Sequence, residues 1–141
     1  MLGRHMIKGW SIPQAVIALS SGEAEYYGIV KGSSVGLGIR SVLADLGCKT
    51  RLVVCTDSSA AKGMSSRKGL GRVRHVEVNQ LWVQEKVGSG EIELRKVNGS
   101  DNIADALTKH VVKEGITKHM GNTGQSWVHG RHAIMPKVAN M

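Results

Sequence analysis

The sequence predicts an α/β fold with a mixed central sheet flanked by helices. The continuous apolar run Leu52–Cys55 is typical of a strand that is buried on both faces. Expected strands also alternate with expected helices along the chain, which favours a partly parallel sheet. The chain has 141 residues, of which 41% are hydrophobic and 21% are charged. These values predict one compact globular domain rather than a disordered chain.

The charge balance indicates a polyanionic partner. Lys and Arg number 19 against 11 Asp and Glu, which gives a formal net charge of +8. Nucleic acid is the partner that such a surface favours, although many basic domains bind no polyanion.

The cysteine and hydropathy patterns predict an intracellular protein, cytoplasmic or nuclear. Cys48 and Cys55 form neither a metal-ligand spacing nor a disulfide framework, which favours a reducing compartment. No apolar run approaches the roughly 20 residues that span a bilayer. Met1–Trp10 lacks the apolar region and cleavage site of a signal peptide. We therefore expect neither membrane association nor secretion.

The first elements are a short strand and a long helix. Gly3–Ser11 suits a strand or strand end ahead of a turn at Pro13. The pattern S-x-x-E from Ser20 to Glu23 is a capping box and predicts a helix from Ser21 towards Gly47. Glycines in the middle of this segment should weaken or bend the helix, so one bent helix and two consecutive helices are equally plausible. These glycines are Gly28, Gly32, Gly36 and Gly38.

The middle of the chain follows a strand–helix–loop–helix order. The strand Leu52–Cys55 leads into Thr56 and Asp57, and Ser58–Ser66 fits a short helix. Ser65–His75 is expected to be a basic loop. A helix over Val76–Val87 should turn Leu81, Trp82 and Val83 inward and end at Gly88–Gly90.

A second strand and further helices complete the expected order. Glu91–Arg95 alternates polar and apolar residues as a strand does, and Asn98-Gly99 marks a turn. Ser100 is placed to cap a helix that runs through Leu107. His110–Met141 is interpreted as a helical extension followed by a loosely packed tail.

Three carboxylates are candidate metal ligands. Asp57 ends a strand, at the edge of the sheet where open α/β proteins bind ligands, although a helix cap explains it equally well. Glu23 also fits the capping box, and Asp105 also fits a surface ion pair with Lys109. Together the three would supply the hard oxygen ligands that a Mg²⁺ phosphodiester site requires, and Mn²⁺ suits the same ligands.

A basic segment is the candidate for phosphate contact. Gly69 and Gly71 would let its backbone approach a nucleic acid closely, although a solvated loop explains the segment as well. Trp82 is better explained as a core residue than as a base-stacking platform. The candidate nucleic-acid-binding residues are Arg67, Lys68, Arg72, Arg74 and His75.

Four segments resemble one known family. Gln14–Tyr27, Cys55–Ala61, Arg74–Val78 and Asp101–Lys109 are similar, in order and spacing, to the ribonuclease H domain of copia-type long-terminal-repeat retrotransposon polyproteins. The resemblance spans about 3–109. It implies a ribonuclease H-like domain over 1–109, with 110–141 as a carboxy-terminal extension and tail.

The resemblance implies a fold, a reaction and roles for three residues. It implies the ribonuclease H-like fold and hydrolysis of the RNA strand of RNA–DNA hybrids by two Mg²⁺ ions on four carboxylates. Glu23 matches the glutamate of the family's first helix, Asp57 the aspartate that ends its fourth strand, and Asp105 the aspartate of its last helix.

One departure from the family concerns the amino terminus. The chain begins near the family's third strand, so the first two strands and the first catalytic aspartate are absent, and no residue before Glu23 is acidic. The resemblance therefore implies an amino-terminally truncated fold in which Leu52–Cys55 has an unpaired edge. A reverse transcriptase domain or a second chain is an expected partner that would supply the strands, beside the RNA–DNA hybrid itself. A rearranged fold and an incomplete reading frame are the other two explanations.

Two alternatives remain open at this point. Without the first aspartate, the chain could be a catalytically impaired remnant that binds nucleic acid or serves a structural role. A different member of the same nuclease superfamily, such as an integrase core, also groups acidic residues on this fold, although the spacing from Asp57 to Asp105 fits it less well.

Overall fold

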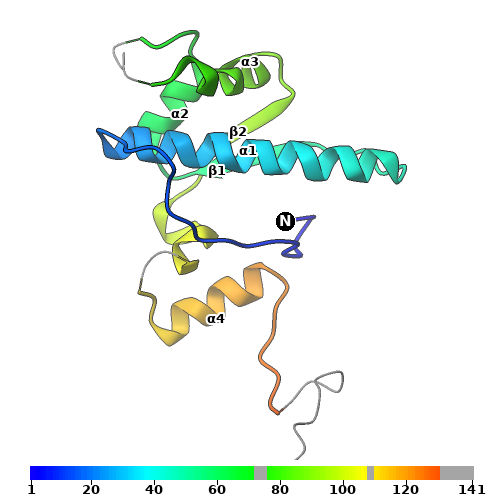
Figure 1. Cartoon of the computed structure of the whole chain (residues 1–141). Helices are drawn as coiled ribbons and strands as arrows, with labels where there is room; N and C mark the ends of the chain where they lie inside the picture. Colours follow the sequence, from blue (N-terminus) through cyan, green and yellow to red (C-terminus); the bar gives the residue numbers. More distant parts are fainter. Residues whose placement is uncertain (72–75, 108–109, 131–141) are drawn as a thin grey trace, which may run out of the picture. The chain divides into compact units, whose positions relative to one another are not determined.

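The computed structural model describes residues 1–71, 76–107 and 110–130. The chain divides into two compact units, one formed by Ile12–Asn102 and the other by Met1–Ser11 with Ile103–Met141. The described residues form four α-helices and two parallel strands, so the architecture is α/β as predicted (Figure 1). No described helix is long and apolar enough to cross a membrane.

Helix α1, Ser21–Asp45, is one continuous helix that crosses the larger unit. The Oγ of Ser20 accepts a hydrogen bond of 3.2 Å from the backbone N–H of Glu23, which confirms the predicted start. A run of buried side chains faces the core, which explains how a glycine-rich helix is stabilised by packing rather than by propensity. These side chains are Tyr26, Tyr27, Ile29 and Val30.

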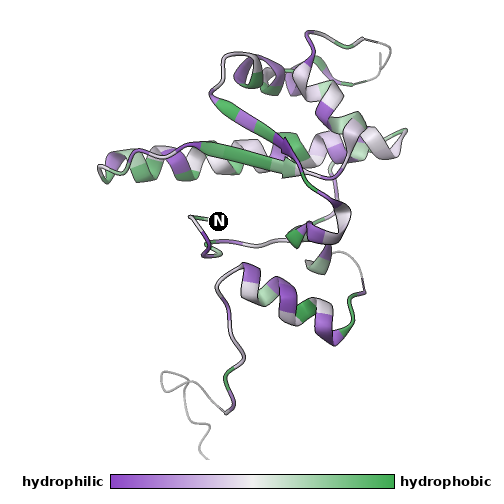
Figure 2. Ribbon diagram, turned by 180° about the vertical axis from the view of Figure 1, so that it is seen from behind, coloured by the Kyte–Doolittle hydropathy of each residue, from purple (hydrophilic) through white to green (hydrophobic). Residues whose placement is uncertain are grey.

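Strands β1, Leu52–Thr56, and β2, Ile92–Lys96, form a two-stranded parallel sheet. Its register pairs Leu52 with Ile92 and Thr56 with Lys96. The prediction that Leu52–Cys55 is buried on both faces is wrong, because Cys55 is exposed and the rest of the run is half-buried. Figure 2 shows the reason: α1 lies behind the sheet, and no described helix of the larger unit covers the side that faces the viewer.

Glycine allows α1 to approach its neighbours closely. A Cβ on Gly22 would lie 2.9 Å from the Cβ of Ala60, and one on Gly36 would lie 2.6 Å from the Cδ1 of Leu52. Gly28 and Gly32 have no such neighbours within 4 Å. The first two glycines are therefore packing positions, whereas the other two only lower the helix propensity.

Helices α2, Ser59–Ser66, and α3, Trp82–Gly88, complete the larger unit. Helix α2 agrees with the prediction. The predicted helix over Val76–Val87 is correct only in its second half, because Glu77 is extended and a short 3₁₀ turn at Val78–Gln80 comes before α3. Val83 is fully buried as expected, whereas Leu81 and Trp82 are half-buried against the core.

The predicted helix from Ser100 to Leu107 is absent. Two 3₁₀ turns, Gly99–Asp101 and Ile103–Leu107, occupy this segment. The backbone of Asn102, with φ −74° and ψ 102°, is extended between them and prevents a continuous helix.

The other unit contains α4, Lys113–Asn122, which confirms a helix after residue 110. The strand expected at Gly3–Ser11 is wrong. This segment has one bridge between Leu2 and His5, and the backbone N–H of Met6 donates to the carbonyl of Thr123 at 3.2 Å. The described part of the chain offers no strand to pair with it, so its apolar pattern alone does not make a strand.

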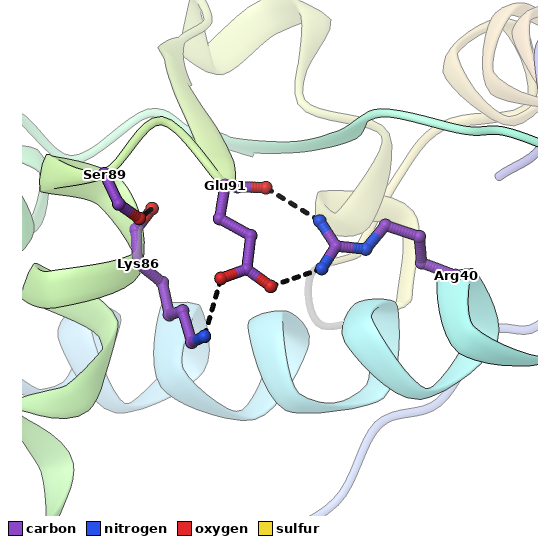
Figure 3. Close-up of polar contacts among 4 residues, drawn as sticks. All are labelled: Arg40, Lys86, Ser89 and Glu91. Carbon is purple, nitrogen blue, oxygen red and sulfur yellow. Dashed lines mark hydrogen bonds and ion pairs between the residues drawn. The ribbon is translucent and has the colours of Figure 1, made fainter. Parts of the chain in front are cut away.

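An ion-pair network links helices α1 and α3 to Glu91, the residue before β2 (Figure 3). The Nζ of Lys86 on α3 lies 2.6 Å from Oε2 of Glu91, and the guanidinium of Arg40 on α1 contacts Oε1. Arg40 also donates to the backbone carbonyl of Glu91 at 3.0 Å. The hydrogen bond from Lys86, followed by that from Arg40, lowers the pKa of Glu91 below its ordinary value of 4.5.

The lowered pKa of Glu91 predicts a pH dependence of folding. A carboxyl group whose pKa is lowered in the folded state stabilises that state above its unfolded pKa, and this contribution is lost as the pH falls from 4.5 through the folded pKa. We expect Glu91→Gln to remove this part of the fall in the free energy of unfolding at low pH, as measured by urea unfolding between pH 3 and 7. The exposed Glu85 of α3 provides a matched control. If Glu85→Gln reduced the pH dependence of the free energy of unfolding as much as Glu91→Gln, the effect could not be assigned to the Glu91 ion pairs.

The close approach at Gly22 predicts opposite effects of the same substitution at two positions of α1. Gly22→Ala should lower the free energy of unfolding by about 1–3 kcal/mol, because the added methyl group overlaps Ala60. The methyl group added by Gly28→Ala meets open space, so this substitution should raise the free energy of unfolding by about 0.5–1 kcal/mol. Urea unfolding of both variants measures the difference, and a Gly22→Ala protein as stable as the parent would contradict the packing.

Candidate metal and nucleic-acid site

Asp57 lies at the carboxyl edge of the parallel sheet. It directly follows β1, and its Oδ2 lies 3.7 Å from where a Cβ on Gly99 would be, so the loop after β2 passes beside it. Its half-buried side chain makes no hydrogen bond or ion pair within the described part of the chain. Ligands of open α/β sheets bind beyond this edge of the strands.

Asp57 is not the cap of the helix that follows it. Helix α2 is capped by Ser58, whose Oγ accepts a hydrogen bond of 3.1 Å from the backbone N–H of Ala61. The backbone N–H of Ser58 donates in turn to Oγ1 of Thr56 at 3.1 Å. The capping alternative for Asp57 is therefore wrong, and no structural role is visible for its carboxylate among the described residues.

Lys96 is a cation that sequence reasoning did not single out. It ends β2 opposite Thr56, and its Nζ donates to Oγ of Ser59 at the start of α2. This places an exposed ammonium group at the same edge of the sheet as Asp57. The parallel register was the missing signal, because it brings residues that are far apart in sequence to one edge.

Glu23 is almost completely buried, with 1% of its surface exposed. Its Oε1 accepts a hydrogen bond of 2.8 Å from the hydroxyl of Tyr27, and its Oε2 accepts one of 2.9 Å from the backbone N–H of Leu19. Burial, followed by the hydrogen bond to Glu23, raises the pKa of Tyr27 to about 12. The Oγ of Ser20 accepts a hydrogen bond from the backbone N–H of Glu23, which confirms the capping interaction between the two residues. The Glu23 carboxylate bonds the backbone N–H of Leu19, the residue before the N-cap residue Ser20.

The packing of α1 on α2 brings the segments of two candidate ligands together. Gly22, beside Glu23, touches Ala60 in the first turn of the helix that follows Asp57. Asp105 lies in the other unit, in the 3₁₀ turn Ile103–Leu107, and its side chain is half-buried.

The carboxylates of the candidate ligands are of the chemical type that binds a hard divalent cation. Carboxylate oxygens are the ligands that Mg²⁺ and Mn²⁺ prefer. The set is not complete in the parts described. Over residues 1–71, 76–107 and 110–130, no group of three or more His, Cys, Asp or Glu is arranged to hold a metal ion.

The basic segment is built differently from the expectation. The guanidinium of Arg67 turns back onto its own loop, where it donates to the carbonyl of Leu70 at 2.6 Å and lies against Gly71. Burial raises the pKa of the nearby Tyr26 to about 12, and the charge of Arg67 acts in the opposite direction. Lys68 is exposed. The predicted contacts Arg72, Arg74 and His75 lie outside the described residues.

Gln84 on α3 holds this loop, a role that no pattern in the sequence indicated. Its Oε1 accepts from the backbone N–H of Gly69 at 2.7 Å, and its Nε2 donates to the carbonyls of Met64 at 2.8 Å and Gly69 at 3.1 Å. Gly69 has φ +77°, which glycine adopts without strain. The buried Gln84 amide therefore fixes the path of the loop next to Lys68 before any ligand binds.

The loop predicts a measurable role for Gln84. Gln84→Leu removes three hydrogen bonds and should lower the free energy of unfolding by about 1–3 kcal/mol, because buried backbone groups lose their partner. It should also speed hydrogen exchange at the amide of Gly69. Gln80→Leu is the control, because its amide donates to the adjacent Asn79 near the surface. If hydrogen exchange at the Gly69 amide were unchanged in Gln84→Leu, the proposed role of Gln84 in holding the loop would be wrong.

Curated proteins that are similar to the chain include Pol polyproteins from three plant transposons. It is 30% identical over 100 residues to the retrovirus-related Pol polyprotein from transposon TNT 1-94 of Nicotiana tabacum, over 70% of this chain and 8% of that protein. It is 32% identical over 111 residues to the Pol polyprotein from transposon RE1 of Arabidopsis thaliana, over 77% of this chain and 8% of that protein. The Pol polyprotein from transposon RE2 of the same plant is 30% identical over 111 residues, over 77% of this chain and 8% of that protein.

The chain spans about 8% of the length of these relatives. No protein-family model matches it. No solved structure matches it. Its homologues are therefore retrovirus-related Pol polyproteins from plant transposons, of which it corresponds to a short segment.

Proposed function

We propose that the chain is a ribonuclease H-like segment of a retrotransposon Pol polyprotein, which hydrolyses the RNA strand of RNA–DNA hybrids. The observation that carries the proposal is Asp57, whose half-buried carboxylate lies at the ligand-binding edge of the sheet and makes no contact that would explain it within the described ranges. The Pol homology and the four family-like segments support the same assignment.

In this proposal Asp57 and Glu23 are ligands of a divalent cation, Mg²⁺ or Mn²⁺, and Asp105 is a ligand by its match to the family's motif. Such ions, when bound, supply an activated water and neutralise charge on the leaving 3′ oxygen. Asp57 contributes a carboxylate from the sheet edge, and Glu23 contributes one whose orientation is fixed by its hydrogen bonds. The role of Asp105 rests on the resemblance of Asp101–Lys109 to the family's last helix.

Cations near the same edge would bind the hybrid. Lys96 and Lys68 are exposed in the larger unit and are proposed to contact phosphates, although the Nζ of Lys96 also donates to Oγ of Ser59. Arg67 remains a proposed phosphate contact, and its guanidinium also bonds the carbonyl of Leu70 within its own loop. Arg72, Arg74 and His75 remain proposed contacts on the basis of the sequence alone.

A strand partner is part of the proposal. Strand β1 pairs with β2 on one edge, and within the residues that the structure covers no strand pairs with the other. A reverse transcriptase domain or a second chain would pair with this edge, since unpaired backbone groups there are a template for another strand.

A second candidate function is a nucleic-acid-binding or structural remnant without catalysis. The observation that favours it is the lack of any group of three metal-binding side chains among the residues described. The net charge of +8 would still favour binding to a hybrid.

A charge substitution at Asp57 separates the two functions. Asp57→Asn should lower RNA-strand cleavage by about a hundredfold or more, since metal-ion catalysis contributes several kcal/mol and each 1.36 kcal/mol or so is tenfold in rate. Cleavage of a labelled hybrid in Mg²⁺ and in Mn²⁺ at low salt measures this effect, with binding followed in parallel.

The exposed Asp45 at the end of α1 provides the matched control, because Asp45→Asn makes the same charge change away from the sheet edge. Cleavage that survived Asp57→Asn would contradict the assignment of this residue. Salt-sensitive binding without cleavage by the parent chain would instead support the remnant.

A further inference from the structure

Helix α1 has a second apolar face on the side opposite its buried one. Tyr26, Ile29 and Val30 are buried on the core side. At about 100° per residue, a second set of apolar residues and glycines lies on the opposite side of the helix. The spacings along this set alternate between four and three residues, which is the period of a coiled-coil contact. This set, the outer face, consists of Gly28, Gly32, Val35, Ile39, Val42 and the C-cap residue Leu46.

The outer face is open in the structure. Val42 is 59% exposed and Leu46 is 73% exposed. A Cβ on Gly28 or Gly32 would meet no neighbour within 4 Å among the described residues. The carboxy-terminal end of α1 also extends past the strands and the other helices of the larger unit (Figure 1). Exposed apolar side chains in one line along a helix are typical of a surface that packs against another helix.

Small and bulky residues lie at opposite ends of the outer face, the glycines at the amino-terminal end. We propose that α1 pairs with α1 of a second copy of this chain, antiparallel and along the outer face. This pairing sets Leu46 against Gly28 of the second copy. It sets Val42 against Gly32 in the same way, so each bulky side chain meets a position that has no side chain. A single two-fold axis generates all of these contacts.

Charged residues beside the outer face complement each other in this pairing. Lys31 and Asp45 come directly before Gly32 and Leu46, so they lie on the same flank of the outer face. Both are exposed, and neither forms an ion pair with another described residue. Antiparallel helices bring equivalent flanks together, which places Lys31 of each copy beside Asp45 of the other. The charges therefore favour a second copy as the partner.

A parallel pair fits the same residues poorly. It would set Leu46 against Leu46 and Gly28 against Gly28 of the second copy, which leaves a gap at the glycine end. It would also leave Lys31 and Asp45 about four turns apart. The antiparallel contact extends over about five turns of one helix, which is small for a specific interface, so the pair should dissociate on dilution.

The pairing leaves the candidate site open. Gly22 and Gly36 contact α2 and β1 from the core side of α1, so the sheet edge at Asp57 takes no part in it. This inference goes beyond the proposed function and does not depend on a metal ion or on catalysis. Cleavage assays on dilute protein, including those of Asp45→Asn, report on the monomer.

The first test is sedimentation equilibrium of the full chain between about 1 μM and 1 mM. We expect a reversible dimer. Val42→Glu should raise its Kd about a hundredfold or more, because the two-fold axis places two unpaired carboxylates in the contact. Ile17→Glu is the matched control, since Ile17 is 88% exposed and lies before α1, and its Kd should stay within about twofold of the parent.

The second test addresses the register. The side chain added by Gly32→Leu starts in open space in the monomer but overlaps Val42 of the second copy, so the Kd should rise about tenfold. Lys31→Asp should raise the Kd about fivefold, and the charge exchange Lys31→Asp with Asp45→Lys should restore it to within about twofold. Circular dichroism of dilute samples establishes that each variant is folded.

Three results would overturn the proposal. A parent chain that stays monomeric over the whole concentration range has no such pair. A dimer that survives Val42→Glu forms through another surface, such as the edge of β1. Tighter association of Gly32→Leu would show non-specific apolar contact, because the added side chain would then strengthen the dimer rather than obstruct it.

Discussion

The close approach of α1 to β1 and α2 is the constraint on which the larger unit depends. It occurs at two glycines of one helix, Gly22 against Ala60 and Gly36 against Leu52. A side chain at Gly22 would push α1 away from α2, and one at Gly36 would push it away from β1, so the buried face of α1 would lose contacts. This packing compensates for the low helix propensity of the glycines, so tertiary contacts rather than local preference stabilise the 25-residue helix.

The same approach links stability to the candidate site. It brings the first turn of α1, with Glu23, against the helix that begins after Asp57. A buried carboxylate is tolerated only where hydrogen bonds replace its water, and Leu19 and Tyr27 provide them. The contacts that begin the helix therefore also shape the side chain that we propose as a ligand. Substitutions there are expected to affect folding and function together.

Local signals predicted much of the fold, and long-range contacts account for the rest. The capping box, the apolar run at Leu52 and the alternation at β2 each depend on neighbouring residues, and the structure confirms these elements. The strand at Gly3–Ser11 failed because a strand requires a partner that no local pattern reveals. The hydrogen bond of Arg67 to Leu70 and those of Gln84 to the loop depend on the packing of α3 against the loop. Charge and spacing could not distinguish these roles.

Asp57 and Glu23 show how a structural role and a functional role are divided in this chain. Both residues had a capping explanation in the sequence. After β1, Ser58 makes the cap, so the carboxylate of Asp57 has no structural task among the described residues and lies where ligands bind. At α1, Glu23 takes part in the cap itself, so a role in metal binding requires that its hydrogen bonds and the cation use different lone pairs. Asp57 is consequently the stronger basis for the proposed function, and Glu23 is the residue whose function depends on its neighbours.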